Sequence, residues 1–193
     1  MPAWRPSTGH IRLLCFALCA IPLGQAAWWI ASAQLGVNPI ETLTHHSGQW
    51  ALRLLLVTLA MSPLQRLARW RWPLQIRRQL GLWSFFYLLC HFAVYLVFDL
   101  SLSLARLGEE ILERPYITVG FAALLLLTPL AVTSTRGWQR RLRRNWKRLH
   151  RLVYPAAVLA CVHFIWKVKV SEPEPFIYLT VLLVLFAVRL RRA

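Results

Sequence analysis

Acidic residues are scarce in this sequence. Its 193 residues include 7 Asp and Glu against 23 Lys and Arg, which gives a formal net charge of +16. Soluble nucleic-acid-binding proteins can carry such a charge, but this chain is also 58% hydrophobic, with 10 Trp and a mean hydropathy of +0.48. That apolar fraction excludes intrinsic disorder. The composition therefore indicates a membrane protein of one domain, residues 1–193, with the lipid bilayer and not nucleic acid as its partner.

Several common motifs are missing as well. The chain has no GxGxxG or P-loop sequence that would bind a dinucleotide or nucleotide, and no internal repeat is visible. No stretch alternates apolar and polar residues with the period of two that membrane β-strands require. The four cysteines lack the loop context of disulfides, so we expect Cys15, Cys19, Cys90 and Cys161 to pack as small apolar side chains. An all-α membrane protein is the expected fold class.

Six apolar stretches approach the roughly 20 residues that a helix needs to cross a bilayer. They cover residues 11–33, 46–64, 80–100, 116–135, 152–168 and 175–190. Residues 101–114 interleave Leu and Ile with charge, which is typical of a short helix at the membrane interface. We therefore predict a six-helix transmembrane bundle with an interfacial helix between its third and fourth helices. The first stretch is either a retained helix or a cleaved signal peptide, and its length favours the retained helix.

The positive charges are distributed unevenly about these spans. Eighteen of the 23 Lys and Arg residues lie before or at the start of the first span, between the second and third, between the fourth and fifth, and at the end of the sixth. The opposite connections carry only Arg106, Arg114, Lys167 and Lys169, together with every acidic residue. Because cytoplasmic loops are enriched in Lys and Arg, both termini are predicted to face the cytoplasm.

Two of the six histidines lie inside predicted spans. His91 follows Arg78 by 13 residues and His163 follows Arg151 by 12, so both lie about 18–20 Å from the cytoplasmic side. Neutral imidazoles at one depth on two helices can bind one iron from opposite faces without bringing charge into the membrane. We therefore predict bis-His ligation of a b-type haem. The alternatives are hydrogen bonds to backbone carbonyls and a proton relay, whereas zinc lacks further ligands at that depth.

Two other residues each allow two interpretations. His150 opens the fifth span at the cytoplasmic edge, where it either ligates a second haem or is a titratable residue of a basic interface. Arg53 is the one charged residue inside the second span. Its side chain either snorkels to the outer interface or serves as a counter-ion for haem propionates.

Longer segments of the sequence resemble one known family. They include RRQLGLWSFFYLLCHFAVY around His91, TSTRGWQRRLRRNWKRLHRLVY around His150, HFIWKVK at His163 and HHSGQWALRLLLVTLAMSPLQR in the second span. Together they are similar to the MsrQ/YedZ family, the haem-binding membrane subunits of the periplasmic methionine sulfoxide reductase system. This family is a branch of the ferric-reductase-like transmembrane superfamily, and the resemblance covers essentially the whole chain.

The resemblance implies a multi-pass cytochrome of the bacterial inner membrane that carries b haem, with FMN as a further cofactor. It implies electron transfer from membrane quinone to a periplasmic molybdopterin-containing reductase, its heterodimer partner, which repairs methionine sulfoxide in proteins. The family's haem-associated positions match His91, His150 and His163. The superfamily's second His on the third helix falls at Arg77, a candidate cofactor contact that departs from the pattern of a second bis-His haem.

Functions of other classes stay open on the residues alone. One is a small haem-free transporter whose histidines relay protons, and another is a haem-free subunit that anchors a periplasmic enzyme. As an electron-transfer subunit, the chain is expected to have no substrate chemistry of its own. The outer connections 34–44, 101–114 and 169–174 are the surfaces available for docking a periplasmic partner.

Overall fold

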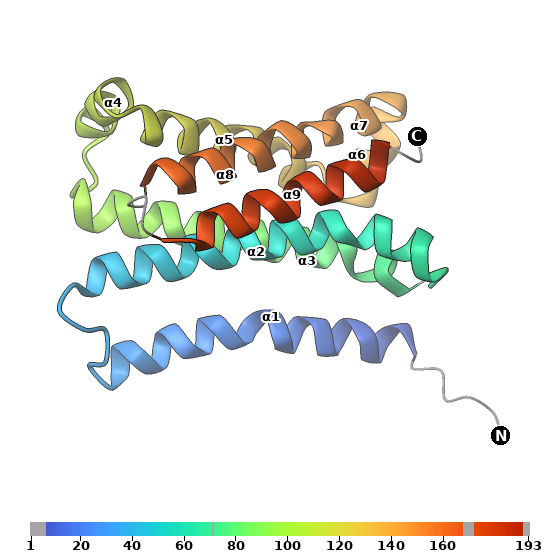
Figure 1. The fold of residues 1–193 in the computed structure, drawn as a ribbon, viewed down its shortest axis with the longest axis horizontal. Coiled ribbons are helices and arrows are strands. Elements are labelled where there is room, and N and C mark those ends of the chain that lie inside the picture. The colour runs from blue at the N-terminus through green and yellow to red at the C-terminus, as the bar shows by residue number, and fades with distance from the viewer. Residues whose placement is uncertain (1–6, 71, 168–171, 191–193) are drawn as a thin grey trace.

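The computed structural model describes residues 7–70, 72–167 and 172–190, and every regular element in these ranges is a helix. This confirms the expected all-α class. Figure 1 shows the long helices running side by side as an elongated bundle. In chain order the elements are α1 (Thr8–Ala31), α2 (Pro39–Ala68), α3 (Trp72–Val94), the π-helical turn η1 (Tyr95–Asp99), α4 (Leu104–Glu113), α5 (Pro115–Val132), α6 (Arg136–Leu142), α7 (Arg144–Leu149), the 3-10 turn η2 (His150–Leu152), α8 (Val153–Lys167) and α9 (Glu174–Leu190).

Five helical segments of the described chain are long and apolar enough to cross a membrane. They are Thr8–Ala31, Pro39–Ala68, Trp72–Asp99, Pro115–Val132 and Arg144–Lys167. The sixth predicted span coincides with α9, a helix of 17 described residues. The count of six spans and the cytoplasmic termini therefore stay predictions. Of the charges behind the predicted orientation, five lie outside the described residues: Arg5, Arg71, Lys169, Arg191 and Arg192.

Local sequence signals fix where the helices begin. The Asn38 side chain accepts a hydrogen bond from the backbone N–H of Glu41, and Pro39 occupies the first turn of α2. Pro115 has the same place in α5. Proline suits a first turn because its missing N–H would have no helical partner there. These two starts matter for the site, because α2 and α5 each contribute their first turns to it.

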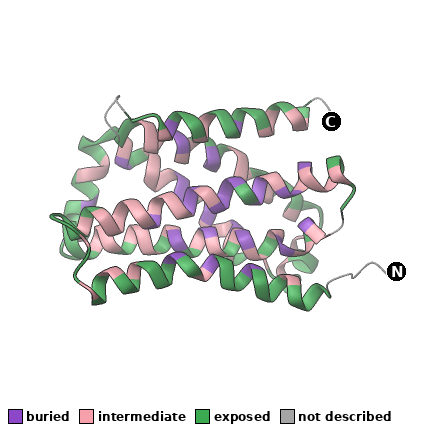
Figure 2. Ribbon diagram, turned by 60° about the horizontal axis from the view of Figure 1, so that its bottom comes forward, coloured by how far each residue is buried: buried purple, intermediate pink, exposed green. Residues whose placement is uncertain are grey.

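The helices pack as two pairs, α3 along α2 and α8 along α5, with α9 against α2 and α8. One buried core joins α2, α5, α8 and α9 around Leu59, Ala156, Ala157 and Leu182. A second core joins α1, α2 and α3 around Leu54, Leu80 and Tyr87. Figure 2 shows the buried residues concentrated in the middle of the bundle, whereas α1 is largely exposed. In a membrane protein that exposed apolar surface faces lipid.

Helix α1 is hydrogen-bonded to its neighbours in spite of its exposure. The Tyr87 hydroxyl donates to the Cys19 carbonyl (2.7 Å), the Gln79 amide donates to the Arg12 carbonyl (3.0 Å), and His46 Nε2 donates to the Pro22 carbonyl (2.9 Å). Three polar contacts to α2 and α3 tie this helix into the bundle. Retention of this helix, rather than its cleavage as a signal peptide, stays a prediction.

Two smaller predictions have clear outcomes. A helix does form within residues 101–114, where α4 is capped by the Ser103 hydroxyl and buries Leu107. The cysteines are all free, as expected. Three of them, Cys15, Cys19 and Cys161, are buried in the two cores, and Cys90 is half-buried.

Candidate functional site

His91 on α3 and His163 on α8 lie close together in one cavity. Their ring centres are 6.1 Å apart and the ring planes differ by 80°. The cavity has a volume of about 640 Å³ and is lined by α2, α3, α5 and α8. Sites for small molecules and cofactors typically have about 300–1,000 Å³. The structure thus brings the two predicted ligands together in a space of cofactor size.

The two imidazoles are held by equivalent hydrogen bonds. His91 Nδ1 donates to the Thr44 carbonyl (2.8 Å), and His163 Nδ1 donates to the Tyr116 carbonyl (2.7 Å). Because a carbonyl only accepts, each Nδ1 carries the proton and each Nε2 keeps its lone pair. Neither Nε2 is hydrogen-bonded within the described residues. An imidazole anchored through one nitrogen, with the other left available, is the usual form of a metal ligand.

The distance between the rings allows a test of whether they fit a haem. An imidazole nitrogen bonds a transition metal at about 2.0 Å, and the ring centre lies about 1 Å beyond that nitrogen. Two imidazoles on opposite sides of one iron therefore have ring centres about 6 Å apart. The observed 6.1 Å agrees with this separation. The pair fits a haem iron, for which the porphyrin supplies the remaining four nitrogens.

Two glycines make room for the histidines. A Cβ atom built on Gly48 of α2 would lie 2.8 Å from His91 Nδ1, and one built on Gly120 of α5 would lie 2.7 Å from His163 Nδ1. Any side chain at either position would displace the ring. The sequence interpretation missed both glycines, because close approach between helices becomes visible only once the pairing of the helices is known.

The two halves of the site form an internal repeat. In each half, the residue whose backbone carbonyl accepts the histidine's hydrogen bond precedes a glycine by four positions, about one helical turn, and precedes the histidine by 47 positions. The second set lies 72 positions after the first (44 to 116, 48 to 120 and 91 to 163). The members are Thr44, Gly48 and His91, and then Tyr116, Gly120 and His163. No repeat is visible in the sequence as a whole, and this matched spacing of three positions is the signal that the sequence interpretation missed.

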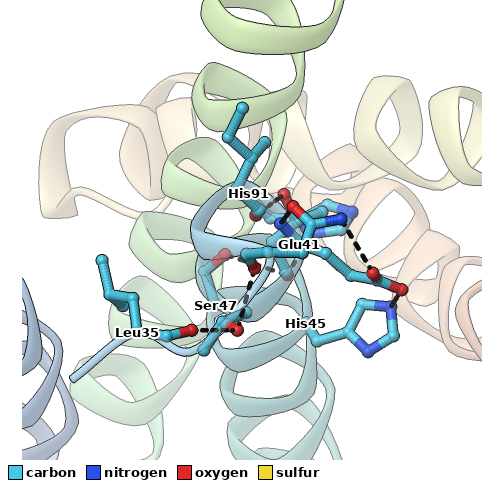
Figure 3. A network of polar contacts seen from close by, with 9 residues as sticks. Leu35, Glu41, His45, Ser47 and His91 are labelled. Atoms are coloured by element: carbon cyan, nitrogen blue, oxygen red, sulfur yellow. Dashed lines mark hydrogen bonds and ion pairs between the residues drawn. The ribbon is translucent and has the colours of Figure 1, made fainter.

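Charged side chains line the same cavity near the first turns of α2 and α5. Arg114 forms an ion pair with Glu110 (3.1 Å), and Lys167 lies at the end of α8. Figure 3 shows the first turns of α2 beside His91, where His45 Nε2 is 3.8 Å from a Glu41 carboxylate oxygen. Sequence reasoning assigned no cofactor role to Arg114 or Lys167, although they are two of the few positive charges on the predicted outer side.

Arg53 lies in a polar network between α2 and α9. Its Nε donates to the Tyr178 hydroxyl (2.6 Å), and its Nη2 forms an ion pair with Glu174 (2.8 Å). The Gln49 amide donates to the other Glu174 oxygen (2.9 Å). Arg53 does not line the cavity around the histidines. Its guanidinium already has an acidic partner, and the role of propionate counter-ion stays a prediction.

His150 and Arg77 lie toward the other end of the bundle. His150 Nδ1 donates to the Trp146 carbonyl (3.1 Å), and its ring stacks on the Trp146 ring with 3.9 Å between centres. Arg77 donates to the Ser62 hydroxyl (3.0 Å). His150 is thus not brought to the other two predicted ligands. In the described parts of the chain, no group of three or more His, Cys, Asp or Glu side chains is placed to hold a metal ion.

Comparisons with known proteins agree with this arrangement. Residues 47–161 match the family described as ferric reductase like transmembrane component. The chain is 52% identical over 162 residues to the protein-methionine-sulfoxide reductase heme-binding subunit MsrQ of Xanthomonas axonopodis pv. citri, covering 84% of this chain and 74% of that protein. It is 42% identical over 187 residues to the subunit of the same name from Herminiimonas arsenicoxydans, covering 95% and 86%.

Proposed function

The chain belongs to the ferric-reductase-like transmembrane family and, within it, to the MsrQ subunits, and from this premise we propose that it binds a b haem between His91 and His163. The observation that carries the proposal is the pair of imidazoles 6.1 Å apart, each anchored through Nδ1 in one cavity. A bound haem supplies a one-electron carrier inside the membrane. The two neutral rings hold iron without adding charge, and their carbonyl partners fix the ring orientation.

We propose that positive groups of the same cavity bind the two haem carboxylates. Arg114 and Lys167 line this cavity and Arg53 does not, so they are better candidates than Arg53. Arg53 instead contributes indirectly, by neutralising Glu174 close to the outer end of α2. This assignment places the carboxylates toward the outer end, where such groups reach water at lower cost than in the middle of the bundle.

The positions of His150 and Arg77 support one haem rather than two. In the family pattern His150 is haem-associated, and Arg77 occupies the position of the superfamily's further ligand. Here the neighbours of these side chains are Trp146 and Ser62, and neither supplies a second imidazole. Both residues stay predicted cofactor contacts through the family resemblance, with His150 as the one that could bind iron.

The direction of electron flow comes from the family resemblance, and the proposed topology agrees with it. Six spans with both termini in the cytoplasm would put the His91–His163 pair in the outer half of the bacterial inner membrane. We propose that residues 1–193 act as one domain, which takes electrons from the quinone pool and delivers them to a periplasmic molybdopterin methionine sulfoxide reductase. The outer connections 34–44 and 101–114 are the proposed docking surface for this partner. The third predicted docking segment, 169–174, is described only for residues 172–174.

FMN enters only through the family resemblance. A second cavity at the basic end of the bundle has about 190 Å³, which is below the roughly 300–1,000 Å³ typical of sites for ligands of cofactor size. The residues of that cavity therefore do not enclose an FMN, and no electron-transfer step is assigned to a flavin.

Absorption spectroscopy of the purified protein tests the haem proposal. We expect the split α-band spectrum of a low-spin b haem and one haem per chain in a pyridine haemochrome assay. His91→Ala and His163→Ala should each lower the haem content to background, because neither half-site alone would supply both imidazoles. His10→Ala, which changes an exposed histidine at the start of α1, is the matched control. Unchanged spectra in both ligand variants would refute the proposal.

A further inference from the structure

The second cavity has an unusual wall. It lies where α2, α3, α8 and α9 meet, at the end of the bundle opposite the His91–His163 pair. Three of its lining residues are arginines, Arg66, Arg77 and Arg189, and the remaining polar groups of the wall are the hydroxyls of Ser62 and Tyr154. Among the described residues, no Asp or Glu lines it. Arginines from three helices therefore line this cavity, and no carboxylate among its lining residues balances their charge.

Neutral groups satisfy these arginines only in part. Arg189 donates to the Leu59 carbonyl (2.6 Å) and to the Tyr154 hydroxyl, and Arg77 donates to the Ser62 hydroxyl (3.0 Å). Arg189 Nε is buried and has no hydrogen-bond partner within the described chain. An unpaired buried N–H of a charged group is costly. The wall of the cavity thus carries positive charge that no acidic side chain of the described residues neutralises.

Among the described residues, no acidic side chain lies at this end of the bundle. Glu41, Glu110 and Glu174, the acids of all three ion pairs found in the described residues, belong to the opposite end, where α2 and α9 begin and α4 lies. Arginines confined in one cavity repel one another. A ligand with negative charge would offset this repulsion.

We propose that this cavity binds the phosphate group of an anionic phospholipid. Arginine presents a planar fork of donors that matches phosphate oxygens, and basic pockets between membrane helices bind anionic head groups. The volume of about 190 Å³ suits a head group better than a whole cofactor. Leu67 and Val188 complete the wall with apolar surface, which suits the glycerol and acyl portion of a lipid. Free phosphate shares the recognised chemistry and is the other source. None of the residues of this cavity lines the cavity of His91 and His163.

Lipid binding to the full-length protein in detergent tests this proposal. Phosphatidylglycerol should raise the thermal unfolding midpoint above that in phosphatidylcholine, and native mass spectrometry should count one retained phosphatidylglycerol. The double variant Arg66→Gln/Arg77→Gln should weaken binding by about tenfold or more, the loss expected when charge-assisted hydrogen bonds are removed. Arg140→Gln/Arg144→Gln removes the same charge from exposed positions on α6 and α7 and should bind as the wild type does.

Each outcome is decisive for the site. Protection by inorganic phosphate in place of the lipid would retain the site and identify free phosphate as its ligand. Absence of any effect from both, or an equal loss in the two double variants, would overturn the proposal. If the double variant does not fold, Arg66→Gln replaces it, because Arg66 is exposed and its change leaves the other two arginines in place. That single variant should bind the lipid several-fold more weakly, and unchanged binding would also overturn the proposal.

Discussion

The helix pairs α2–α3 and α5–α8 present their histidines in the same way but differ in what surrounds them. In both pairs a carbonyl and a glycine one turn apart receive a ring from the neighbouring helix. Beyond that, α2 carries Arg53 in an ion pair with α9, whereas the equivalent position 72 residues later is Leu125, which is 57% exposed. The comparison shows that one backbone carbonyl and one glycine are the features shared by the two helix pairs in positioning each histidine ring. The rest of each pair is free to make other contacts.

Close packing between the helices also differs between the two pairs. The Ser84 hydroxyl on α3 donates to the Ala51 carbonyl on α2 (2.7 Å). The equivalent residues of the second pair are Ala156 and Ala123, which are both buried and have no side-chain donor. Small side chains allow the helices to approach closely in both pairs. At this position α2 and α3 are joined by a hydrogen bond from Ser84 to Ala51, whereas the two alanines of α5 and α8 only pack against each other's helices.

Substituting the glycine that each half places against its histidine should give the largest effect, on haem affinity. Gly48→Ala and Gly120→Ala each place a methyl group within 3 Å of an imidazole nitrogen. We expect each to weaken haem binding about 10–100-fold, the loss typical when a group that orients a metal ligand is disturbed, and by similar factors in the two halves. Haem titration of the purified apoprotein measures this. Gly24→Ala is the control, because a Cβ there meets no atom within 4 Å.

Unequal results would be informative. If one glycine variant binds haem as the wild type does and the other loses it, the two halves are not equivalent. If neither variant changes haem affinity, the rings do not need the positions described here, and the assignment of the glycines fails.

Removing the Arg53–Glu174 ion pair, which has no equivalent in the α5–α8 pair, should give an intermediate effect, on stability. Arg53→Gln leaves Glu174 without its cationic partner, so the contact between α2 and α9 should weaken. The expected loss of stability is about 1 kcal/mol, at the low end for a charged hydrogen bond because both side chains are about one-third exposed. Thermal unfolding in detergent measures it, with the exposed Arg106→Gln as control. The haem spectrum should not change, and a changed spectrum would support the counter-ion role instead.

Replacing Ser84 by the alanine found at the equivalent position of α8 should give the smallest effect, on stability. Ser84→Ala reproduces at α3 the residue that α8 carries at the equivalent position. We expect a loss of about 0.5–1.5 kcal/mol, because one buried hydrogen bond between helices is removed. Thr180→Ala is the control, since the Thr180 hydroxyl is exposed and bonds only within α9. A loss in the control as large as that in Ser84→Ala would show that the contact between α2 and α3 is not the cause.

Much of this site could be predicted from the sequence. The parts that were missed depend on which helices pack against each other. Counting residues from the basic flanks gave His91 and His163 the same depth because α3 and α8 cross the bundle in the same direction. The partner of Arg53 could not be found this way, since Glu174 is 121 positions away and α9 had no assigned neighbour. The boundaries of α2 were predicted too short at both ends, because polar residues such as Glu41 and Arg66 lower hydropathy without interrupting a helix.

The spacing within the repeat also has a consequence for the order in which the protein is made. The chain leaves the ribosome from its N-terminus, so the first half-site, which ends at His91, is complete before Tyr116 has been synthesised. At that stage one imidazole is anchored but its opposite partner does not exist. Stable capture of a ligand that needs both must therefore wait until α8 has been inserted beside α5. If the cofactor needs both imidazoles, as proposed, it can bind stably only after the helices of the bundle have assembled.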